Sequence, residues 1–523
     1  MLAVLILLPV FAVLLRLGEA SPEWGHLSRT VLPGYLGNTL VLVVATVALS
    51  LLLSVLPAWL VTTCEFPGRR LLSWTLVLPL AIPTYVAAFV YYQIPEAAIP
   101  LLVRIRQSAG VDAFLAAELV LRYSLLVLML AAVLQPYVYL ACRAAFARQG
   151  RLLIEASRCL GDSPRRAFFG VALPLARPAM VAGSALVAME VVNDYGAVHF
   201  FGVPTLTEGI FRTWFGMGDK VAALRIAGIL VLAVTGLLVL EQALRGRARY
   251  ACPEGGDSPL QRLRLSPAKA LAALAVCLVP LALGFLYPVA RLGHWAWLHL
   301  SSAVERAPWD GAALGRGFAL ALGTAFGATL LAAIFAYAAR LRETRYRRLL
   351  LRSAGIGYAM PGAVVALGVL AVLGAFDRLS IPFLPMLGGT LFAISFAYTA
   401  RFFAVPLQLA KAGMDRLGKP LEEASRLLGS PPLETFLRID LPLLRAPLVA
   451  GGMLLFVDIL KELPLTLILR PVNFETLATR AYSLASEARL QACAIPALLI
   501  VAAGAAGLLI MNRWLQPSSN DER

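Results

Sequence analysis

The sequence predicts an all-α polytopic membrane protein with about 12 transmembrane helices, arranged as two parallel six-helix repeats. Three observations lead to this fold class. Of the 523 residues, 60% are hydrophobic and only 15% are charged, and the mean hydropathy is +0.79, whereas a soluble chain is about 45–50% apolar and about 25% charged. The apolar residues form runs of roughly 20, which are long enough to cross a ~30 Å hydrocarbon core as helices. The third observation is that the two halves of the chain repeat one another.

Apolar runs define the predicted spans. Their length excludes an outer-membrane barrel, whose strands alternate over about 10 residues, and their spread along the chain excludes a soluble domain with a single anchor. The first run lacks the basic start of a signal peptide and has a counterpart later in the chain, so we interpret it as a span. The predicted spans are 2–17, 37–62, 71–94, 118–142, 178–201, 221–243, 268–290, 315–339, 350–374, 386–410, 447–469 and 490–512.

The distribution of Lys and Arg predicts the orientation in the membrane. With both termini placed in the cytoplasm, the cytoplasmic segments hold 30 of the 46 basic residues and the outer segments hold 13. Cytoplasmic loops of membrane proteins are enriched in Lys and Arg. We therefore expect both termini in the cytoplasm, and the net charge of +16 does not indicate a nucleic-acid partner.

Residues 155–183 and 423–451 are copies of one element, and EASRCLG in the first recurs as EASRLLG in the second at an offset of 268. Upstream, Ile82–Pro83 corresponds to Met360–Pro361, and both prolines are expected to kink their spans. Six spans per half make the repeat parallel, because the second copy enters the membrane in the same direction as the first. We predict a first half 1–244 (core about 36–243), a cytoplasmic linker 245–267 and a second half 268–523 (core about 314–512).

The repeated element lies in a polar loop between the fourth and fifth span of each half, at 148–177 and 411–446. EASRCLG is typical of a short amphipathic helix that ends at a glycine, and Ser163–Pro164 is typical of a second helix start. The alternative is a merely solvated basic loop. Two copies that keep Glu, Gly and Pro in register argue against it, so we expect each loop to be a docking surface for a cytoplasmic partner.

The pattern E-A-x-x-x-x-G followed by x-L-P resembles the EAA loop of binding-protein-dependent ABC importer permeases. The resemblance implies the type I importer permease fold. It also implies a partner ATPase subunit that binds ATP and Mg at each loop, and an external substrate-binding protein. Both copies have Ser where the motif has its second Ala (Ser157 and Ser425). The ATPase-coupling positions that the resemblance implies are Glu155, Ala156, Gly161, Glu423, Ala424 and Gly429.

Residues 189–215 and 461–480 resemble the fused two-domain permeases of ferric iron importers, and the similarity covers nearly the whole chain. This implies a bacterial cytoplasmic (inner) membrane protein that supplies both pore halves to two ATPase copies and moves ferric iron by alternating access. Permeases for thiamine and polyamines have the same loops. They remain alternatives for the substrate.

Ionisable and polar side chains inside two spans are candidates for the transport pathway, because such groups are costly in a bilayer. At the offset of 268 they form equivalent sets, and the carboxylates of each set are spaced i, i+4, which predicts one helix face. The pathway candidates are Glu190, Asn193 and Asp194 in the fifth span and Asp458, Lys461 and Glu462 in the eleventh.

These carboxylates allow two interpretations. Oxygen ligands suit a hard cation such as Fe³⁺, and Tyr195 and His199 are further candidate ligands, although we assign no metal site. The structural alternative is that Lys461 neutralises a neighbouring carboxylate and that Glu190 satisfies a polar neighbour. Gly196 and Pro464 are expected to break their helices just beyond.

The chain is not expected to be an enzyme. It has no G-x-x-x-x-G-K followed by Ser or Thr, and it has no zinc-protease, nucleophile-triad or dinucleotide motif. The energy must therefore come from a partner or from an ion gradient. A proton-coupled secondary transporter is the main other class, but such a carrier does not need duplicated docking loops; a membrane-embedded enzyme would need a grouping of catalytic residues. The six scattered cysteines indicate free thiols.

Overall fold

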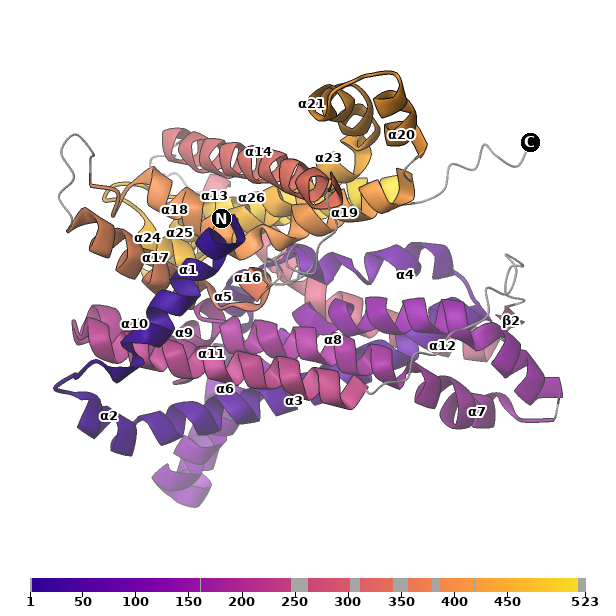
Figure 1. Ribbon diagram of the computed structural model, residues 1–523. Helices are drawn as coiled ribbons and strands as arrows, with labels where there is room; N and C mark the ends of the chain where they lie inside the picture. The colour runs from indigo at the N-terminus through magenta and orange to yellow at the C-terminus, as the bar shows by residue number, and fades with distance from the viewer. Residues whose placement is uncertain are drawn as a thin grey trace. The chain divides into compact units, whose positions relative to one another are not determined.

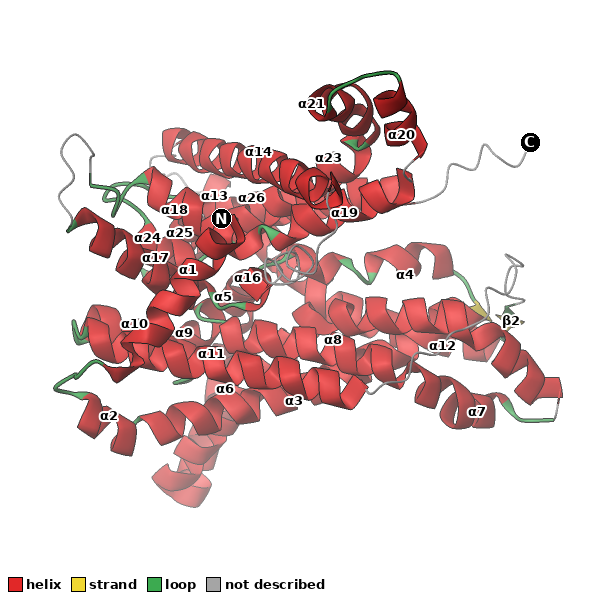
Figure 2. Ribbon diagram, viewed as in Figure 1, coloured by secondary structure: helices red, strands yellow, loops and turns green. Residues whose placement is uncertain are grey.

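The computed structural model describes residues 2–159, 161–245, 262–301, 311–341, 356–378, 386–417 and 420–515. Of the predicted linker 245–267, residues 246–261 lie outside these ranges. Helices account for nearly all of the described chain (Figure 2), which confirms the all-α fold class. Within the described ranges, the strand structure is one short parallel pair, β1 (Cys64–Glu65) with β2 (Leu263–Arg264).

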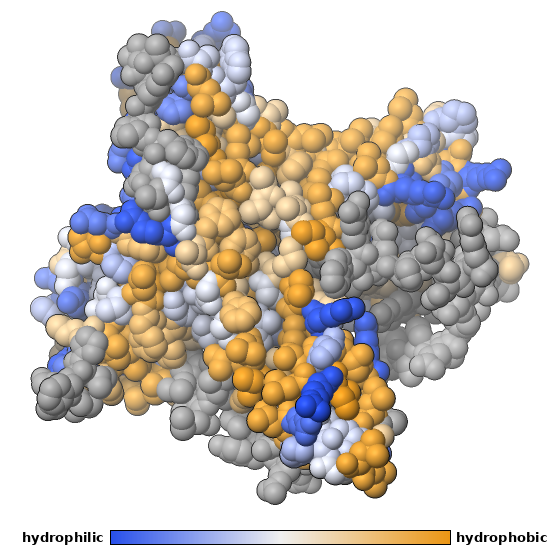
Figure 3. All heavy atoms as spheres, turned by 90° about the horizontal axis from the view of Figure 1, so that it is seen from above, coloured by the Kyte–Doolittle hydropathy of each residue, from blue (hydrophilic) through white to orange (hydrophobic). Residues whose placement is uncertain are grey.

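The helices of the described chain match the predicted spans. Seven helices are long and apolar enough to cross a membrane, three bent helix pairs satisfy the same test as broken spans, and two apolar helices are shorter. Each of the twelve predicted apolar runs falls on one of these. Large apolar side chains are exposed on them, and the face seen in Figure 3 is largely orange, with blue polar residues at its margins. Exposed apolar faces of this extent suit a lipid environment.

The chain packs as two compact units. Unit 1 comprises Met1–Trp24, Ile210–Val231 and Ser302–Arg523, and unit 2 comprises Gly25–Gly209 and Leu232–Ser301. Two helices, α10 (Leu206–Phe211) and α11 (Lys220–Arg245), continue across the division. Figure 1 labels most of the helices of both units.

Unit 1 contains both the start of the chain and its second half. Its helices are α1 (Leu2–Leu15), α14 (Gly311–Leu341), α16 (Ile356–Ala359), α17 (Gly362–Asp377), α18 (Leu391–Phe402), α19 (Ala404–Leu417), α20 (Pro420–Leu427), α21 (Pro432–Thr435), α22 (Leu441–Leu443), α23 (Arg445–Lys461), α24 (Pro464–Leu469), α25 (Leu477–Ser486) and α26 (Leu490–Leu515). Buried apolar side chains of α14, α19 and α23 belong to one hydrophobic cluster, in which α14 contributes three alanines.

Unit 2 contains most of the first half and the beginning of the second. Its helices are α2 (Trp24–Thr30), α3 (Leu32–Thr63), α4 (Arg69–Thr75), α5 (Thr84–Tyr91), α6 (Ile94–Cys159), α7 (Pro164–Ala167), α8 (Leu173–Asn193), α9 (Gly196–Phe200), α12 (Pro267–Leu281) and α13 (Tyr287–Ser301). The long α6 is two helices joined across Gly110, whose φ of 89° and ψ of −179° are not helical.

The first span of each half packs in the unit formed by the other half. In unit 1, α1 packs against α17, and the backbone of Pro9 closely approaches Gly368. In unit 2, α12 packs against α3, and the Tyr91 hydroxyl donates a hydrogen bond to the Leu283 carbonyl just after α12 (2.7 Å). Tyr91 follows the repeat equivalent of Gly368, so both first spans dock at the same place on a third span. The sequence halves therefore describe the duplication, whereas the compact units exchange their first spans.

The prolines of the third and ninth spans break their helices, a stronger effect than the predicted kink. In unit 2 the helical segments Arg69–Ala81 and Thr84–Glu96 meet at 89°. Ile82 is extended (φ −93°, ψ 118°), because the residue before a proline disfavours the helical region. In unit 1, α16 stops before the equivalent proline, and α17 begins directly after it.

Candidate functional site

Both repeated loops, which the charge distribution predicts to be cytoplasmic, contain a helix that ends at a left-handed glycine. In the first loop α6 ends at Cys159 and Gly161 has φ +91°; in the second α20 ends at Leu427 and Gly429 has φ +85°. Glycine adopts this conformation at no steric cost. The predicted helix ends are confirmed in both copies.

The two caps are alike in their hydrogen bonds. The Asp162 N–H donates to the Ser157 carbonyl (3.1 Å), and the Ser430 N–H donates to the Ser425 carbonyl (3.1 Å), the bond of a Schellman motif. Both motif serines are buried, and their hydroxyls hold the following segment. The Ser157 hydroxyl donates to Asp162 Oδ2 (2.7 Å), and the Ser425 hydroxyl lies 2.9 Å from the Thr435 hydroxyl. Serine in place of the motif's alanine therefore fastens each loop internally.

The predicted coupling residues lie on these helices. Glu155 and Ala156 fall in the last turns of α6, and Glu423 and Ala424 are exposed on α20. The structure also exposes Leu427 and Leu428, whose exposed fractions are 88% and 86%. Sequence reasoning missed this apolar pair, although two leucines before a capping glycine in a polar loop were a visible signal. Glu423, Ala424 and Leu427 share one face at helical spacing, opposite the buried serine.

Equivalent aromatic pairs anchor the chain where it returns from each loop. Trp59 lies 5.2 Å from Phe168, measured between ring centroids, and Tyr337 lies 4.7 Å from Phe436. The Tyr337 hydroxyl also donates to the Pro432 carbonyl (2.7 Å). Each phenylalanine begins a π-helical turn, Phe168–Ala172 or Phe436–Asp440. Each loop is thus fixed to the body of its own unit rather than merely solvated.

The fifth and eleventh spans both break at a carboxylate. Helices α8 and α23 end one residue before Asp194 and Glu462, and α9 and α24 begin two residues after them. Asp194 Oδ1 accepts hydrogen bonds from the N–H groups of Ala197 (2.8 Å) and Val198 (3.2 Å), and Glu462 Oε1 accepts from that of Leu465 (3.1 Å). Each carboxylate therefore caps the helix that follows the break.

This geometry corrects one prediction and confirms another. The i, i+4 carboxylates do not share a helix face, because the backbone is already extended at Asp194 (ψ 126°) and at Glu462 (ψ 120°). The helical spacing rule applies only while the helix continues. The predicted breaks near Gly196 and Pro464 are present, and both residues begin the next helix.

Two ion pairs neutralise the carboxylates of the second half. Lys461 Nζ lies 2.9 Å from Asp458 Oδ1, the contact that the structural interpretation predicts. Arg401 Nη1 lies 2.5 Å from Glu462 Oε1, and both side chains are more than nine-tenths buried. Arg401 lies in the last turn of α18, and sequence reasoning did not single it out as a site residue. Local hydropathy does not predict that Arg401 pairs with Glu462, because the two residues lie far apart in the sequence.

The polar groups of the first half make different contacts. The Tyr137 hydroxyl donates to Glu190 Oε1 (3.4 Å). Asn193 is buried, and its Oδ1 has no hydrogen-bond donor among the described residues. The rings of Tyr195 and His199 stack at 5.2 Å. Within the described ranges no three His, Cys, Asp or Glu side chains are grouped as a metal site would require, so the structure gives no support to direct ligation of a metal here.

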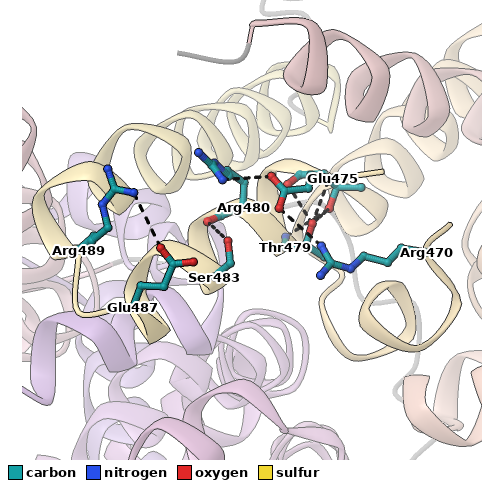
Figure 4. A network of polar contacts seen from close by, with 8 residues as sticks. Arg470, Glu475, Thr479, Arg480, Ser483, Glu487 and Arg489 are labelled. Carbon is teal, nitrogen blue, oxygen red and sulfur yellow. Dashed lines mark hydrogen bonds and ion pairs between the residues drawn. The ribbon is translucent and has the colours of Figure 1, made fainter. Parts of the chain in front are cut away.

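A network of charged side chains surrounds α25, in a segment that the charge distribution predicts to face outward (Figure 4). Glu475 lies 3.7 Å from Arg470 and 3.4 Å from Arg480, and Glu487 lies 3.8 Å from Arg489. These groups are partly exposed, so their ion pairs add little stability. They give unit 1 a mixed-charge surface beside the end of the eleventh span.

Comparisons with known proteins match this organisation. The family described as "Binding-protein-dependent transport system inner membrane component" matches twice, at residues 64–245 and 318–520. The Fe(3+)-transport system permease protein FbpB 2 of Haemophilus influenzae is 25% identical over 515 residues, which cover 97% of this chain and 95% of the relative.

Shorter relatives match part of the chain. The molybdenum transport system permease protein ModB of Escherichia coli is 29% identical over 203 residues, 36% of this chain and 82% of the relative. The sulfate transport system permease protein CysT of Salmonella typhimurium is 28% identical over 202 residues, 38% of this chain and 69% of the relative.

Proposed function

The chain belongs to the family of binding-protein-dependent transport system inner membrane components, and on this basis we propose that it is the permease subunit of an ATP-driven importer for ferric iron. The observation that carries the proposal is the pair of cytoplasmic loops. Both have the same glycine cap, the same buried serine and the same aromatic anchor. Two equivalent docking elements suit two copies of one ATPase partner.

The proposed substrate follows from how much of the chain each relative matches. The relative named for Fe(3+) transport matches almost end to end, including both halves. The relatives named for molybdenum and sulfate match less than two fifths of the chain. We therefore prefer ferric iron to thiamine, a polyamine or an oxyanion.

In this proposal the chain positions partners and does not itself hydrolyse ATP. Two ATPase subunits bind the loops around Gly161 and Gly429, and a substrate-binding protein delivers iron on the opposite side. ATP binding and the loaded binding protein favour the same outward-open state, so their differential affinities for two states drive alternating access. The ion-paired carboxylates of the second half favour weak contact with a cationic substrate, which suits a pathway that must release it.

Uptake of radiolabelled ferric iron tests the proposal. We would compare cells that lack the chain with cells that express it together with its ATPase and binding protein, and measure thiamine, molybdate and sulfate uptake in parallel. Iron uptake alone should depend on the chain. Dependence of another substrate, with iron unaffected, would refute the substrate while leaving the importer class in place.

A further inference from the structure

The second cytoplasmic loop lies between two helices of unit 1 that lead to breaks in their spans. Helix α19 enters the loop, and α23 leaves it. Both run for several turns, so each reaches well away from the loop. Figure 1 shows α20 and α21 at one end of these helices and α17, α18 and α24 toward the other. The two helices pack on one another along the way.

The ends remote from the loop are joined by the buried pair Arg401–Glu462. Arg401 lies directly before the 50° bend between α18 and α19, and Glu462 lies at the break between α23 and α24. Their Nη1 and Oε1 atoms are 2.5 Å apart. Nearby, the Tyr398 and Thr466 hydroxyls are 2.6 Å apart and link α18 to α24 a second time.

The first turn of α17 completes this junction. A Cβ added to Gly362 would lie 2.5 Å from Glu462 Oε1 and would also contact the Arg401 guanidinium, so a side chain at this position would displace the pair. Three broken spans of unit 1 therefore meet at one ion pair. The loop, α19, α23 and this junction are therefore connected to one another in a continuous ring within unit 1.

Among the residues that the structure describes, the first half builds the equivalent junction without a cation. At the repeat offset of 268, Val133 is the equivalent of Arg401, and Val133 is buried. Thr84 stands where Gly362 stands, and its side chain interacts with Asp194, the equivalent of Glu462. The carboxylate still caps the next helix. The repeat thus shows that the cap and the break form without an ion pair.

Stability does not account for the ion pair. Removing two charges from water carries a desolvation penalty that often exceeds their attraction, and well-packed neutral groups of similar volume commonly replace such pairs without loss. The first half, where Asp194 caps the next helix without a paired cation among the described residues, shows that the same chain builds this junction in another way. We infer that Arg401 is a positioning residue, which through Glu462 transmits movement of the second cytoplasmic loop to the break of the eleventh span. The inference rests on the proposed function, because it requires an ATPase that moves this loop.

The test transplants the junction of the first half, which lacks the arginine, into the second. The triple variant R401V/G362T/E462D is purified with its ATPase in nanodiscs and compared with the wild type and with R401K, which keeps the charge. Basal ATP hydrolysis and its stimulation by ferric-loaded binding protein are measured. An introduced V472C, in the outer loop after α24 where Val472 is 92% exposed, reports maleimide labelling with and without ATP and Mg. The native cysteines are replaced in every sample.

We expect the triple variant to assemble with basal hydrolysis within about twofold of the wild type, and to lose stimulation by about tenfold or more, in the range of ordinary coupling between sites. ATP should change the labelling rate at V472C in the wild type and in R401K, but not in the triple variant. Normal stimulation and labelling in the triple variant would overturn the inference. Failure of the triple variant to assemble would also overturn it, because the pair would then serve folding.

The labelling measurement separates this inference from the proposed substrate. It uses ATP alone and requires neither iron nor the binding protein. If ferric-loaded binding protein does not stimulate the wild type while ATP still changes its labelling, the substrate proposal fails and the role of Arg401 is still measured. If ATP does not change labelling in the wild type, transmission to the break is refuted.

Discussion

Replacing Gly161 and Gly429 by alanine together should detach the ATPase while leaving the chain inserted in the membrane. Both glycines are left-handed, with φ +91° and +85°, and a Cβ in that region costs roughly 1–2 kcal/mol. Apart from the two chain neighbours, no atom of the described residues lies within 4 Å of either added Cβ, so the cost is conformational. Because 1.4 kcal/mol corresponds to a factor of ten, the population of each loop in its native cap conformation falls by ~5-fold to ~30-fold. Because both loops are needed, the factors multiply to ~30-fold to ~900-fold.

The assay is co-purification of the ATPase with the tagged chain, followed by ATP hydrolysis stimulated by the binding protein. Gly170→Ala is the matched control, because Gly170 lies in the π-helical turn of the first loop, has no positive φ and has open space around it among the described residues. Asparagine at both positions should give an intermediate loss, because asparagine tolerates the left-handed region better than alanine. Wild-type association of the double alanine variant would refute the role of the caps in ATPase docking.

Two further predictions concern unit 1. Gly368→Val places a Cβ 2.6 Å from the Pro9 carbonyl carbon, and this overpacking should destabilise the docking of α1 by ~1–3 kcal/mol. Thermal unfolding and protease cleavage after α1 measure the effect. An unchanged Tm would contradict the packing of α1 against α17. Asp219→Ala removes the side chain that accepts hydrogen bonds from the Ser21 hydroxyl (2.6 Å) and from the first turn of α11, and should cost about 1 kcal/mol as a lost cap. Burial alone would raise the pKa of Asp219, but these hydrogen bonds outweigh it and hold the pKa below 3.8. The wild type should therefore be more stable than the variant above that pH, and the difference should vanish as the pH falls through the lowered pKa; a difference in Tm that does not change with pH would contradict this.

The sequence alone determined the class of protein, the spans and the ends of the loop helices. Hydropathy predicted the spans, because a span must be apolar wherever the rest of the chain lies. The glycines at 161 and 429 predicted the helix ends, because the left-handed conformation that ends a helix favours glycine whatever surrounds it. The duplication was visible because equivalent helices keep equivalent local signals. Each of these properties depends on residues that are close together in the sequence.

Only the tertiary structure decided which elements lie together. The first spans exchange between units because α1 packs on α17, and nothing in the composition of either helix specifies that partner. Sequence reasoning assigned no role to Arg401, and only the fold brings it to Glu462, far along the chain. Because each of their spans breaks, Asp194 and Glu462 cap the helix that follows and do not extend the face of the helix before it. Pairing of charges and docking of helices depend on contacts between distant segments, and those contacts exist only once the backbone has folded.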